Sequence, residues 1–212
     1  SRVDRDLVAP GMPPFTIVNN ETFRSEVAQV AELGYRGNFG PGVSVSLTAF
    51  HHRYEALRTL EPAGAGRVIA NGAEGRLSGV EAWGELRPLQ NWRLVWGLVA
   101  MRERTELLPG RVNLTEAPLG NNPRRTASLR SLWNVTPTVQ LDLMLRYVGR
   151  LPNPAVPAYT ELNGRLGWRV LPNLDLSLVA VNVLDRDHVE FGAPAQRAVF
   201  GTGYFLKATW AF

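Results

Sequence analysis

The chain has 212 residues, of which 45% are hydrophobic and 20% charged, and its formal net charge at pH 7 is +4. This composition supports one large folded domain, and no run of about 18 apolar residues predicts a membrane-spanning helix. The absence of Cys excludes disulfides, thiolate metal sites and cysteine nucleophiles, and arginines scattered along a chain with almost no lysine argue against a nucleic-acid partner.

Residues 1–22 are expected to form a loop or an extended segment, and residues 23–212 a β-sheet structure. The opening stretch SRVDRDLVAPGMPP is neither a signal peptide nor an initiator methionine, so we expect the sequence to be part of a longer protein. Twenty Gly and 15 Pro interrupt the chain at short intervals. That spacing favours many strands joined by turns over long helices.

Strict alternation of apolar and other residues recurs along the chain and predicts strands of about nine to twelve residues with one apolar face. This is the length that a tilted strand needs to cross a bilayer. In chain order the apolar face collects Val43, Val45, Leu47 and Ala49; Trp92, Leu94, Trp96, Leu98 and Ala100; Val139, Leu141, Leu143, Leu145 and Tyr147; and Leu162, Gly164, Leu166, Trp168 and Val170.

The connections between these strands alternate between short and long. Short turns rich in Pro, Gly or Asn are expected at residues 38–42, 88–91, 136–138 and 171–173, and longer connections around 60–66, 108–123, 151–158 and 185–196. Outer-membrane barrels have this asymmetry, with short periplasmic turns and longer outer loops. The pattern predicts an all-β, antiparallel, up-and-down transmembrane β-barrel segment of about nine strands.

Aromatic residues on the apolar face lie within a few residues of the short turns or of the C-terminus. Bilayer interfaces favour such rings, so these residues are expected to form a membrane-interface belt. They are Tyr35, Trp92, Trp133, Trp168 and Trp210.

The opposite face carries charged residues, including Glu32, Arg36, Glu81, Glu85, Asp142, Arg146, Arg165 and Arg169. These residues would line a wet lumen in a wide membrane barrel, or face solvent in a soluble barrel or sandwich. Alternation alone does not separate the two, but strand length, turn asymmetry and the aromatic belt favour the membrane.

Three stretches of the chain resemble hairpins of TonB-dependent outer-membrane receptors of the siderophore-receptor type. They are SEVAQVAELGYRGNFGPGVSVSLTAFHHRYEAL, GVEAWGELRPLQNWRLVWGLV and ELNGRLGWRVLPNLDLSLVAVNVLDRDHVEFG. The resemblance implies a 22-stranded barrel of which this chain supplies about the last nine strands, without the N-terminal plug and the earlier strands. It also implies energised uptake of a scarce nutrient, most often a ferric siderophore, and a TonB-type energising complex that acts through the plug.

The last nine residues, YFLKATWAF, place apolar side chains at alternate positions and finish on Phe. Barrels of the family that the chain resembles end in this way, and the barrel assembly machinery reads the last strand. Tyr204, Leu206, Trp210 and Phe212 match that pattern. No polar tail is needed because the last strand of a closed barrel pairs with the first and leaves no edge in lipid.

Neither catalysis nor a bound cofactor is expected. The sequence has no Gly-X-Ser-X-Gly elbow, and the adjacent His51 and His52 of a strand point to opposite faces, so they cannot share a metal. A cation site at DRDHVE, around His188, is disfavoured against a solvated loop. No metal site and no enzyme activity are therefore predicted.

If the chain is a receptor segment, ligand contacts are expected from the outer loops and from lumen-facing residues at the outer strand ends. Arginines among them would favour an anionic ferric complex. The candidates are His52, Tyr54, Arg146, Arg150 and Glu161 on strands, with Arg111 and Arg186 in loops.

Two other interpretations stay open at this point. One is a small self-contained outer-membrane barrel, either an enzyme or a structural protein, although an odd strand count argues against it. The other is a soluble β-sandwich binding module. Outer-membrane lipid surrounds the protein in both membrane interpretations.

Overall fold

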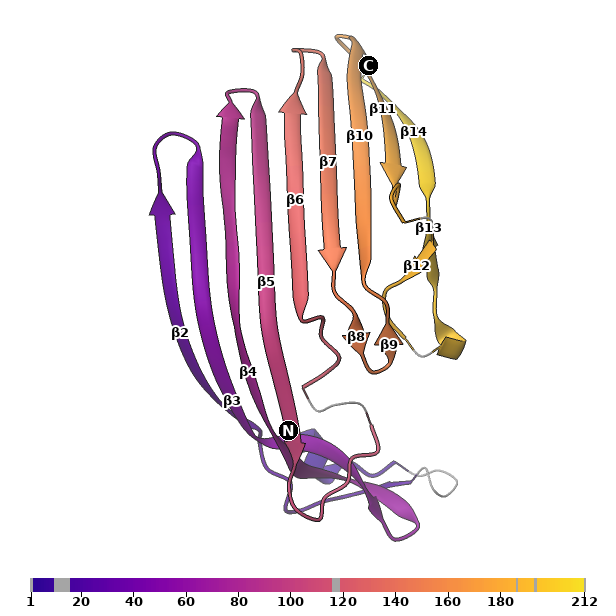
Figure 1. Cartoon of the computed structure of the whole chain (residues 1–212). Coiled ribbons are helices and arrows are strands. Elements are labelled where there is room, and N and C mark those ends of the chain that lie inside the picture. Colours follow the sequence, from indigo (N-terminus) through magenta and orange to yellow (C-terminus); the bar gives the residue numbers. More distant parts are fainter. Residues whose placement is uncertain (1, 10–15, 116–118, 186, 193, 212) are drawn as a thin grey trace. The chain divides into compact units, whose positions relative to one another are not determined.

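The computed structural model describes residues 2–9, 16–115, 119–185, 187–192 and 194–211. One antiparallel sheet dominates it, and its strands follow chain order apart from small insertions, in the sequence β2-β3-β4-β5-β6-β7-β10-β11-β14 (Figure 1). Its strands are β2 (Val27–Asn38), β3 (Val43–Ala63), β4 (Gly66–Leu89), β5 (Trp92–Leu107), β6 (Arg125–Asn134), β7 (Val139–Val148), β10 (Tyr159–Leu171), β11 (Leu174–Val181) and β14 (Gly203–Trp210).

The remaining elements are short. A parallel pairing joins β1 to β4, and two small hairpins, β8-β9 and β12-β13, lie outside the main sheet. Their bounds are α1 (Arg2–Asp6), β1 (Ile17–Val18), β8 (Leu151–Pro152), β9 (Ala155–Val156), β12 (Asp187–Val189), η1 (Pro194–Gln196) and β13 (Val199–Gly201). Residues 1–22, expected to be a loop or an extended segment, thus contain the five-residue α1 and the two-residue β1.

The nine strands of the path confirm the predicted all-β, up-and-down arrangement. Residues 39–42, 90–91, 135–138 and 172–173 form the short turns. In Figure 1 these turns lie at the same end of the strands as the C-terminus. Gly42 supports the first turn with a φ of 99°, which side chains rarely allow, and a Cβ added to it would lie 2.8 Å from the Cβ of Arg87.

The prediction of a long connection around residues 60–66 is wrong. There β3 continues to Ala63 and β4 begins at Gly66, so only a two-residue turn separates them. With 21, 24 and 16 residues, β3, β4 and β5 also exceed the predicted length. In the extensions of β3 and β4, residues of both faces become buried, so the alternation on which the prediction depended disappears there.

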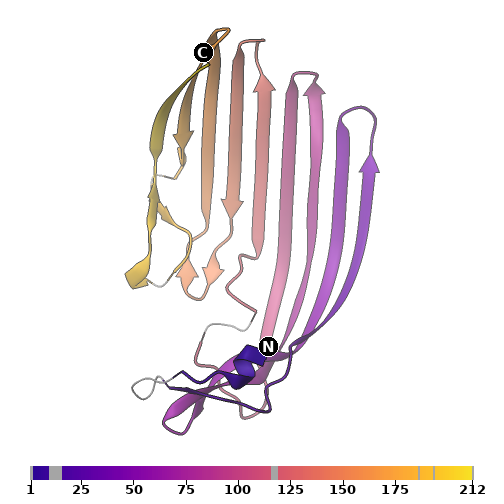
Figure 2. The same ribbon diagram turned by 180° about the vertical axis from the view of Figure 1, so that it is seen from behind.

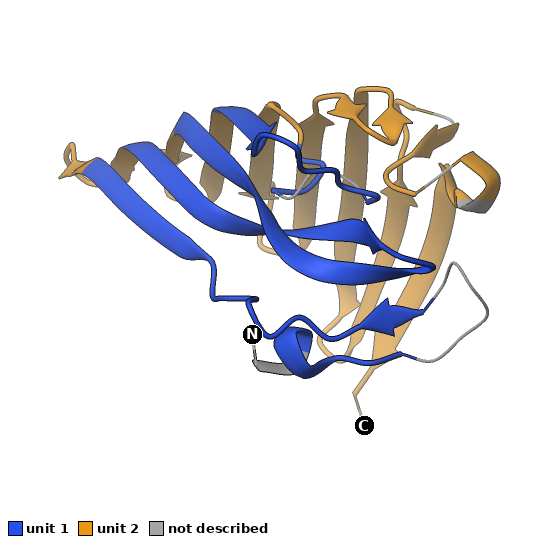
Figure 3. Ribbon diagram, turned by 90° about the horizontal axis from the view of Figure 1, so that it is seen from below, with its two compact units in different colours: residues 1–33, 49–79, 101–122 blue, residues 34–48, 80–100, 123–212 orange. Residues whose placement is uncertain are grey.

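The chain divides into two compact units (Figure 3). Unit 1 comprises residues 1–33, 49–79 and 101–122, and it contains a small core of buried side chains from the N-terminal segment and from the extensions of β3 and β4. The core residues are Phe23, Ala56, Leu57, Ile69, Ala70 and Ala73. Burial of these apolar side chains in a local core stabilises the extensions of β3 and β4 without a further layer of protein over them.

Unit 2 comprises residues 34–48, 80–100 and 123–212. Seen from its two sides in Figures 1 and 2, its main-sheet strands form a single layer in the described residues. Accordingly, its predicted apolar face is exposed: Leu143, Leu166 and Trp210 have exposed fractions of 37%, 48% and 69%. Large apolar side chains left uncovered in this way mark a surface that meets lipid or another protein.

Candidate functional site

Opposite charges face each other on the polar face of unit 2. The strand register places Arg146 of β7 opposite Glu161 of β10, and Arg165 of β10 opposite Asp142 of β7. The Arg165 Nη1 atom lies 3.2 Å from the Asp142 Oδ2 atom. Such cross-strand pairs stabilise a sheet and fix its register. The polar face predicted from the alternation is therefore an organised set of ion pairs.

The Arg146 cluster, which we define as Arg146, Tyr159, Glu161, His188 and Glu190, is the most connected part of this face. The guanidinium of Arg146 donates to Glu161 Oε2 at 2.6 Å and also to Glu190 Oε1. It lies 5.4 Å from the centre of the Tyr159 ring. Two carboxylates against one guanidinium give these groups a formal charge of −1. An anionic ligand would therefore have to compete with two carboxylates for Arg146.

His188 anchors the β12-β13 hairpin to this cluster. Its ring stacks on Tyr159 with centroids 4.1 Å apart, and its Nε2 atom lies 3.3 Å from Glu190 Oε1. It is 7% exposed, and its Nδ1 atom has no hydrogen-bond partner in the described part of the chain. The prediction of a solvated loop at DRDHVE is therefore wrong at His188, because aromatic stacking removes this ring from water.

Asn182 ties the hairpin back to the main sheet. Its backbone N–H donates to Asn163 Oδ1 at 2.8 Å, and its side-chain Nδ2 donates to the Phe200 carbonyl at 2.9 Å. Asn163 in turn donates to Glu161 Oε1 at 2.7 Å. A continuous network thus links β10, the loop after β11 and β13. We expect the loop to keep its conformation as long as this network is intact.

Glu190 lies in the loop, and its pKa reflects these contacts. Burial alone would raise the pKa of this carboxyl, but hydrogen bonds from His188 and Arg146 favour the charged form and hold the pKa below its ordinary value. Glu190 is therefore ionised at neutral pH and remains a partner of Arg146.

In unit 1, two of the predicted ligand residues contact each other. His52 Nδ1 lies 3.2 Å from the Tyr54 hydroxyl, and His52 Nε2 lies 3.3 Å from Glu32 Oε1. The neighbouring His51 contacts Ser78 of β4 instead, at 2.7 Å. The two histidines thus have separate partners, as expected for adjacent residues of a strand.

Arg111, another predicted ligand residue of unit 1, forms an ion pair with the nearly buried Glu61 at 3.0 Å. Glu61 also accepts a hydrogen bond from Thr59, at 2.8 Å. These contacts fasten the loop after β5 to the extension of β3. In this structure the side chain of Arg111 therefore helps to hold the loop after β5 in place.

The other candidates differ in their surroundings. Arg150 follows β7, is exposed, and makes no ion pair with any residue that the structure describes. This leaves its charge available to a ligand. Arg186 lies outside the described residues. The structure thus brings together Arg146 with Glu161, and His52 with Tyr54.

The predicted belt residues lie at the ends of strands, beside the short turns. Trp92 pairs in register with Trp133, and their rings are 5.6 Å apart. Trp168 lies close to the turn at 172–173, and Trp210 pairs with Leu174 just after that turn. Tyr35, near the first turn, is exposed. Their common position is what an interfacial belt requires.

In the expected C-terminal signal, Tyr204, Leu206 and Trp210 lie on β14, where all residues from Tyr204 to Trp210 are exposed. Phe212 lies outside the described residues. Sequence reasoning missed His188 and Glu190 as cluster members. The available signal was an isolated His between acidic residues in a long loop, but the stacking partner Tyr159 is far away in sequence.

Within the described ranges, no helix is long and apolar enough to span a membrane, and no group of three His, Cys, Asp or Glu residues could hold a metal ion.

A family model described as "TonB dependent receptor-like, beta-barrel" matches residues 4–183. The comparison with curated proteins gave no significant match.

Solved structures share the fold at low sequence identity. The FrpB iron transporter from Neisseria meningitidis has a TM-score of 0.74 at 16% identity, with 92% of this chain and 33% of that chain covered. The ferric-catecholate import receptor Fiu from Escherichia coli K12, in its closed form, has a TM-score of 0.70 at 17% identity, with 92% of this chain and 29% of that chain covered. The siderophore receptor PirA from Acinetobacter baumannii has a TM-score of 0.70 at 13% identity, with 93% of this chain and 33% of that chain covered.

This chain therefore spans about a third of the length of these structures. The family match, in contrast, extends over most of the chain, and the single-layer antiparallel sheet agrees with it. The chain belongs to the TonB-dependent receptor-like β-barrel family.

Proposed function

We propose that this chain is the C-terminal barrel segment of an outer-membrane receptor that imports a scarce nutrient, most specifically a ferric siderophore. The observation that carries the proposal is the single-layer sheet with an exposed apolar face and an ion-paired polar face. A soluble sandwich would cover that apolar face with a second sheet, whereas Leu143, Leu166 and Trp210 are exposed in this structure.

The cargo is proposed from the similar structures. Fiu is named as a ferric-catecholate import receptor, FrpB as an iron transporter and PirA as a siderophore receptor. Transport of this kind needs energy from outside the barrel, so a TonB-type complex that acts through a plug is part of the proposal. The barrel assembly machinery and the lipids of the outer membrane are the other partners.

The residues proposed to contact a ligand are His52, Tyr54 and the loop residue Arg111 in unit 1, and Arg150, Glu161 and the loop residue Arg186 in unit 2. Arg146 enters indirectly, because it holds Glu161 and the β12-β13 hairpin together. Among the arginines of this set that the structure describes, Arg150 is the one with no ion pair, so it is the arginine that we expect to contact an anionic ferric complex.

The full-length receptor that contains this chain provides the test. A strain that lacks the receptor is grown under iron limitation with one ferric siderophore at a time, with and without the gene restored. Growth that depends on the receptor for one or more siderophores is the expected result. Dependence on a sugar or on cobalamin would replace the cargo, and a receptor found in the soluble fraction would contradict the whole proposal.

A further inference from the structure

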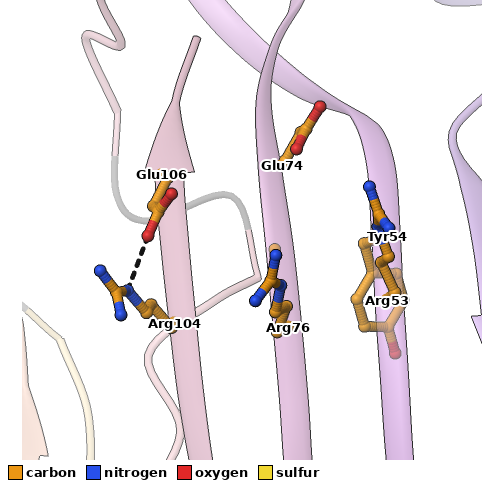
Figure 4. Close-up of a pocket in the computed structure, with 7 residues that line it drawn as sticks. Arg53, Tyr54, Glu74, Arg76, Arg104 and Glu106 are labelled. Carbon is orange, nitrogen blue, oxygen red and sulfur yellow. Dashed lines mark ion pairs between the residues drawn. The ribbon is translucent and has the colours of Figure 1, made fainter.

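Arg146 has two acidic partners, and one of them comes from a loop. Glu161 of β10 lies directly opposite Arg146 in the strand register, whereas Glu190 follows β12 and lies outside the strands. Figure 4 shows a simpler arrangement in unit 1, where Arg104 pairs with Glu106 of the same strand at 2.7 Å. A pair within one strand fixes no other segment. In the Arg146 cluster, by contrast, the position of a loop depends on an ion pair.

The two carboxylates at Arg146 are held unequally. Glu161 accepts hydrogen bonds from both Nε and Nη2 of Arg146, at 2.9 and 2.6 Å. Glu190 accepts one from Nη2, the same nitrogen, and its other contacts are with His188 and Tyr159. A guanidinium that donates two hydrogen bonds to a carboxylate holds it more strongly than one that donates a single bond. Glu190 is therefore the carboxylate that leaves Arg146 more easily.

The charge of the cluster makes such an exchange inexpensive. Glu161 and Glu190 are both mostly buried, and the guanidinium of Arg146 neutralises only one of their two charges. An oxyanion that takes the place of Glu190 keeps the number of ion pairs at Arg146 unchanged. Glu190 then returns to water, where its charge is well solvated.

A hollow lies beside Arg146 on the polar face of unit 2. Gly97 of β5, Ser128 of β6 and Arg146 of β7 form one row in the strand register. Because two of them are small, they leave a space of about 320 Å³, which the three residues line together with Trp83 of β4. A Cβ at Gly97 would lie 3.2 Å from Ser128 Oγ, so this hydroxyl lies beside the glycine. The hollow thus offers a ligand a guanidinium, a hydroxyl and an aromatic ring.

The positive end of the hollow is at Arg146. Glu81 of β4 also lines the hollow, but β5 and β6 separate it from Arg146 on β7. On the β4 side, the guanidinium of Arg36 lies 5.5 Å from the centre of the Trp83 ring. An oxyanion in the hollow is therefore attracted to Arg146, while an apolar or planar part of the same ligand can pack against Trp83.

We propose that Glu190 is an internal competitor for an oxyanion ligand: it occupies Arg146 in the free protein, and a carboxylate or similar oxyanion that enters the hollow displaces it and loosens the β12-β13 hairpin. The inference deepens the proposed function and rests on it for the nature of the natural ligand, an anionic ferric complex. His188 leaves Tyr159 together with Glu190, because both belong to the same segment. Arg146 then adds little to the affinity, since the ligand breaks one ion pair there for each that it forms.

The test uses the full-length receptor in nanodiscs, with a spin label at Val199→Cys, an exposed position of β13. The probe is citrate, whose carboxylates share the chemistry of Glu190, and triethyl citrate is the uncharged comparison at the same ionic strength. In the otherwise unchanged protein the label should be immobile, and citrate should increase its mobile fraction whereas triethyl citrate should not. Glu190→Gln should be mobile without any addition. Calorimetric titration should show that it binds citrate at least about tenfold more tightly, because no carboxylate has to be displaced.

Asp142→Asn is the matched control. It removes the carboxylate partner of Arg165 from the same two strands and leaves the Arg146 cluster intact. Its label should stay immobile and should respond to citrate as in the wild type. Glu190→Asp keeps the charge on a shorter side chain, so its mobility and its citrate affinity should lie between those of the wild type and Glu190→Gln.

Equal citrate affinity for the wild type and Glu190→Gln would overturn the inference, as would a hairpin that stays immobile at saturating citrate. The growth assay for the proposed function separates the two claims. A receptor that imports a ferric siderophore but fails the citrate measurements refutes the inference alone. One that passes them and imports no ferric siderophore refutes only the proposed cargo.

Discussion

At the scale of single residues, Glu190 joins the loop that contains it to the main sheet through Arg146 of β7. It receives hydrogen bonds from both Arg146 and His188, and its pKa lies below the ordinary value. A carboxyl whose pKa is lowered by folding stabilises the folded state above its unfolded pKa of about 4.3, and this stabilisation is lost as the pH falls through the lowered value.

We therefore expect the loop at residues 182–202 to be protected from hydrogen exchange at neutral pH and to open as the pH falls through the lowered pKa of Glu190. Glu190→Gln should open the loop at neutral pH and remove the pH dependence, because the amide carries no charge. Hydrogen exchange of the full-length receptor measures both effects. Loop protection that stays pH-independent in the wild type would show that Glu190 does not hold it.

Gly72 provides a second residue-scale prediction. A Cβ added at this position would lie 2.1 Å from Glu61 Oε1 and 2.7 Å from Thr59 Oγ1, in the middle of a buried hydrogen-bonded group. Gly72→Ala should therefore cost about 1–3 kcal/mol of stability and release Arg111 from Glu61. Gly34→Ala is the control, because its Cβ would meet ordinary contacts at 3.7 Å. Equal denaturation midpoints for the two variants would refute the argument.

At the scale of strands, the two faces of β6 and β7 should respond differently to the same substitution. Leu143 lies on the exposed apolar face, whereas Leu132 lies opposite Asp142 on the polar face. Leu143→Arg should cost about 2–4 kcal/mol near the middle of a bilayer. Leu132→Arg gains a carboxylate neighbour and should cost much less. Unfolding of both receptor variants from lipid vesicles measures the difference, and a larger cost for Leu132→Arg would reverse the assignment of faces.

How far the sequence predicts these strands depends on what determines each one. Alternation identified β7 and β10 because one face of each is apolar throughout, and Pro or Gly marked their short turns. The extensions of β3 and β4 were missed, since Leu57, Ile69 and Ala73 are buried in a local core that erases the period of two. His188 was missed because its stacking partner Tyr159 comes from a strand that is distant in sequence, and a single sequence carries no signal for that contact.

At the scale of the whole molecule, cargo binding should depend on Arg150 more than on Arg146. Arg150→Glu in the full-length receptor should weaken the binding of an anionic ferric siderophore at least about tenfold, because an attractive charge becomes a repulsive one. Arg130→Glu, another charge reversal in the same unit, serves as the control. Tryptophan fluorescence quenching on titration measures both affinities. Unchanged binding by Arg150→Glu would remove this residue from the contact surface.

The central claim is that the apolar face of the sheet contacts lipid and the polar face contacts water. Leu143 and Met144 are neighbours on β7 and point to opposite faces, and the chain has no Cys that would interfere with labelling. Spin labels at Leu143→Cys and Met144→Cys, in the full-length receptor in vesicles, report their accessibility to oxygen and to a water-soluble nickel chelate. The account predicts that oxygen is the more effective relaxing agent at position 143 and the chelate at position 144. A label at position 143 that is shielded from both reagents, as under a second layer of protein, would contradict it.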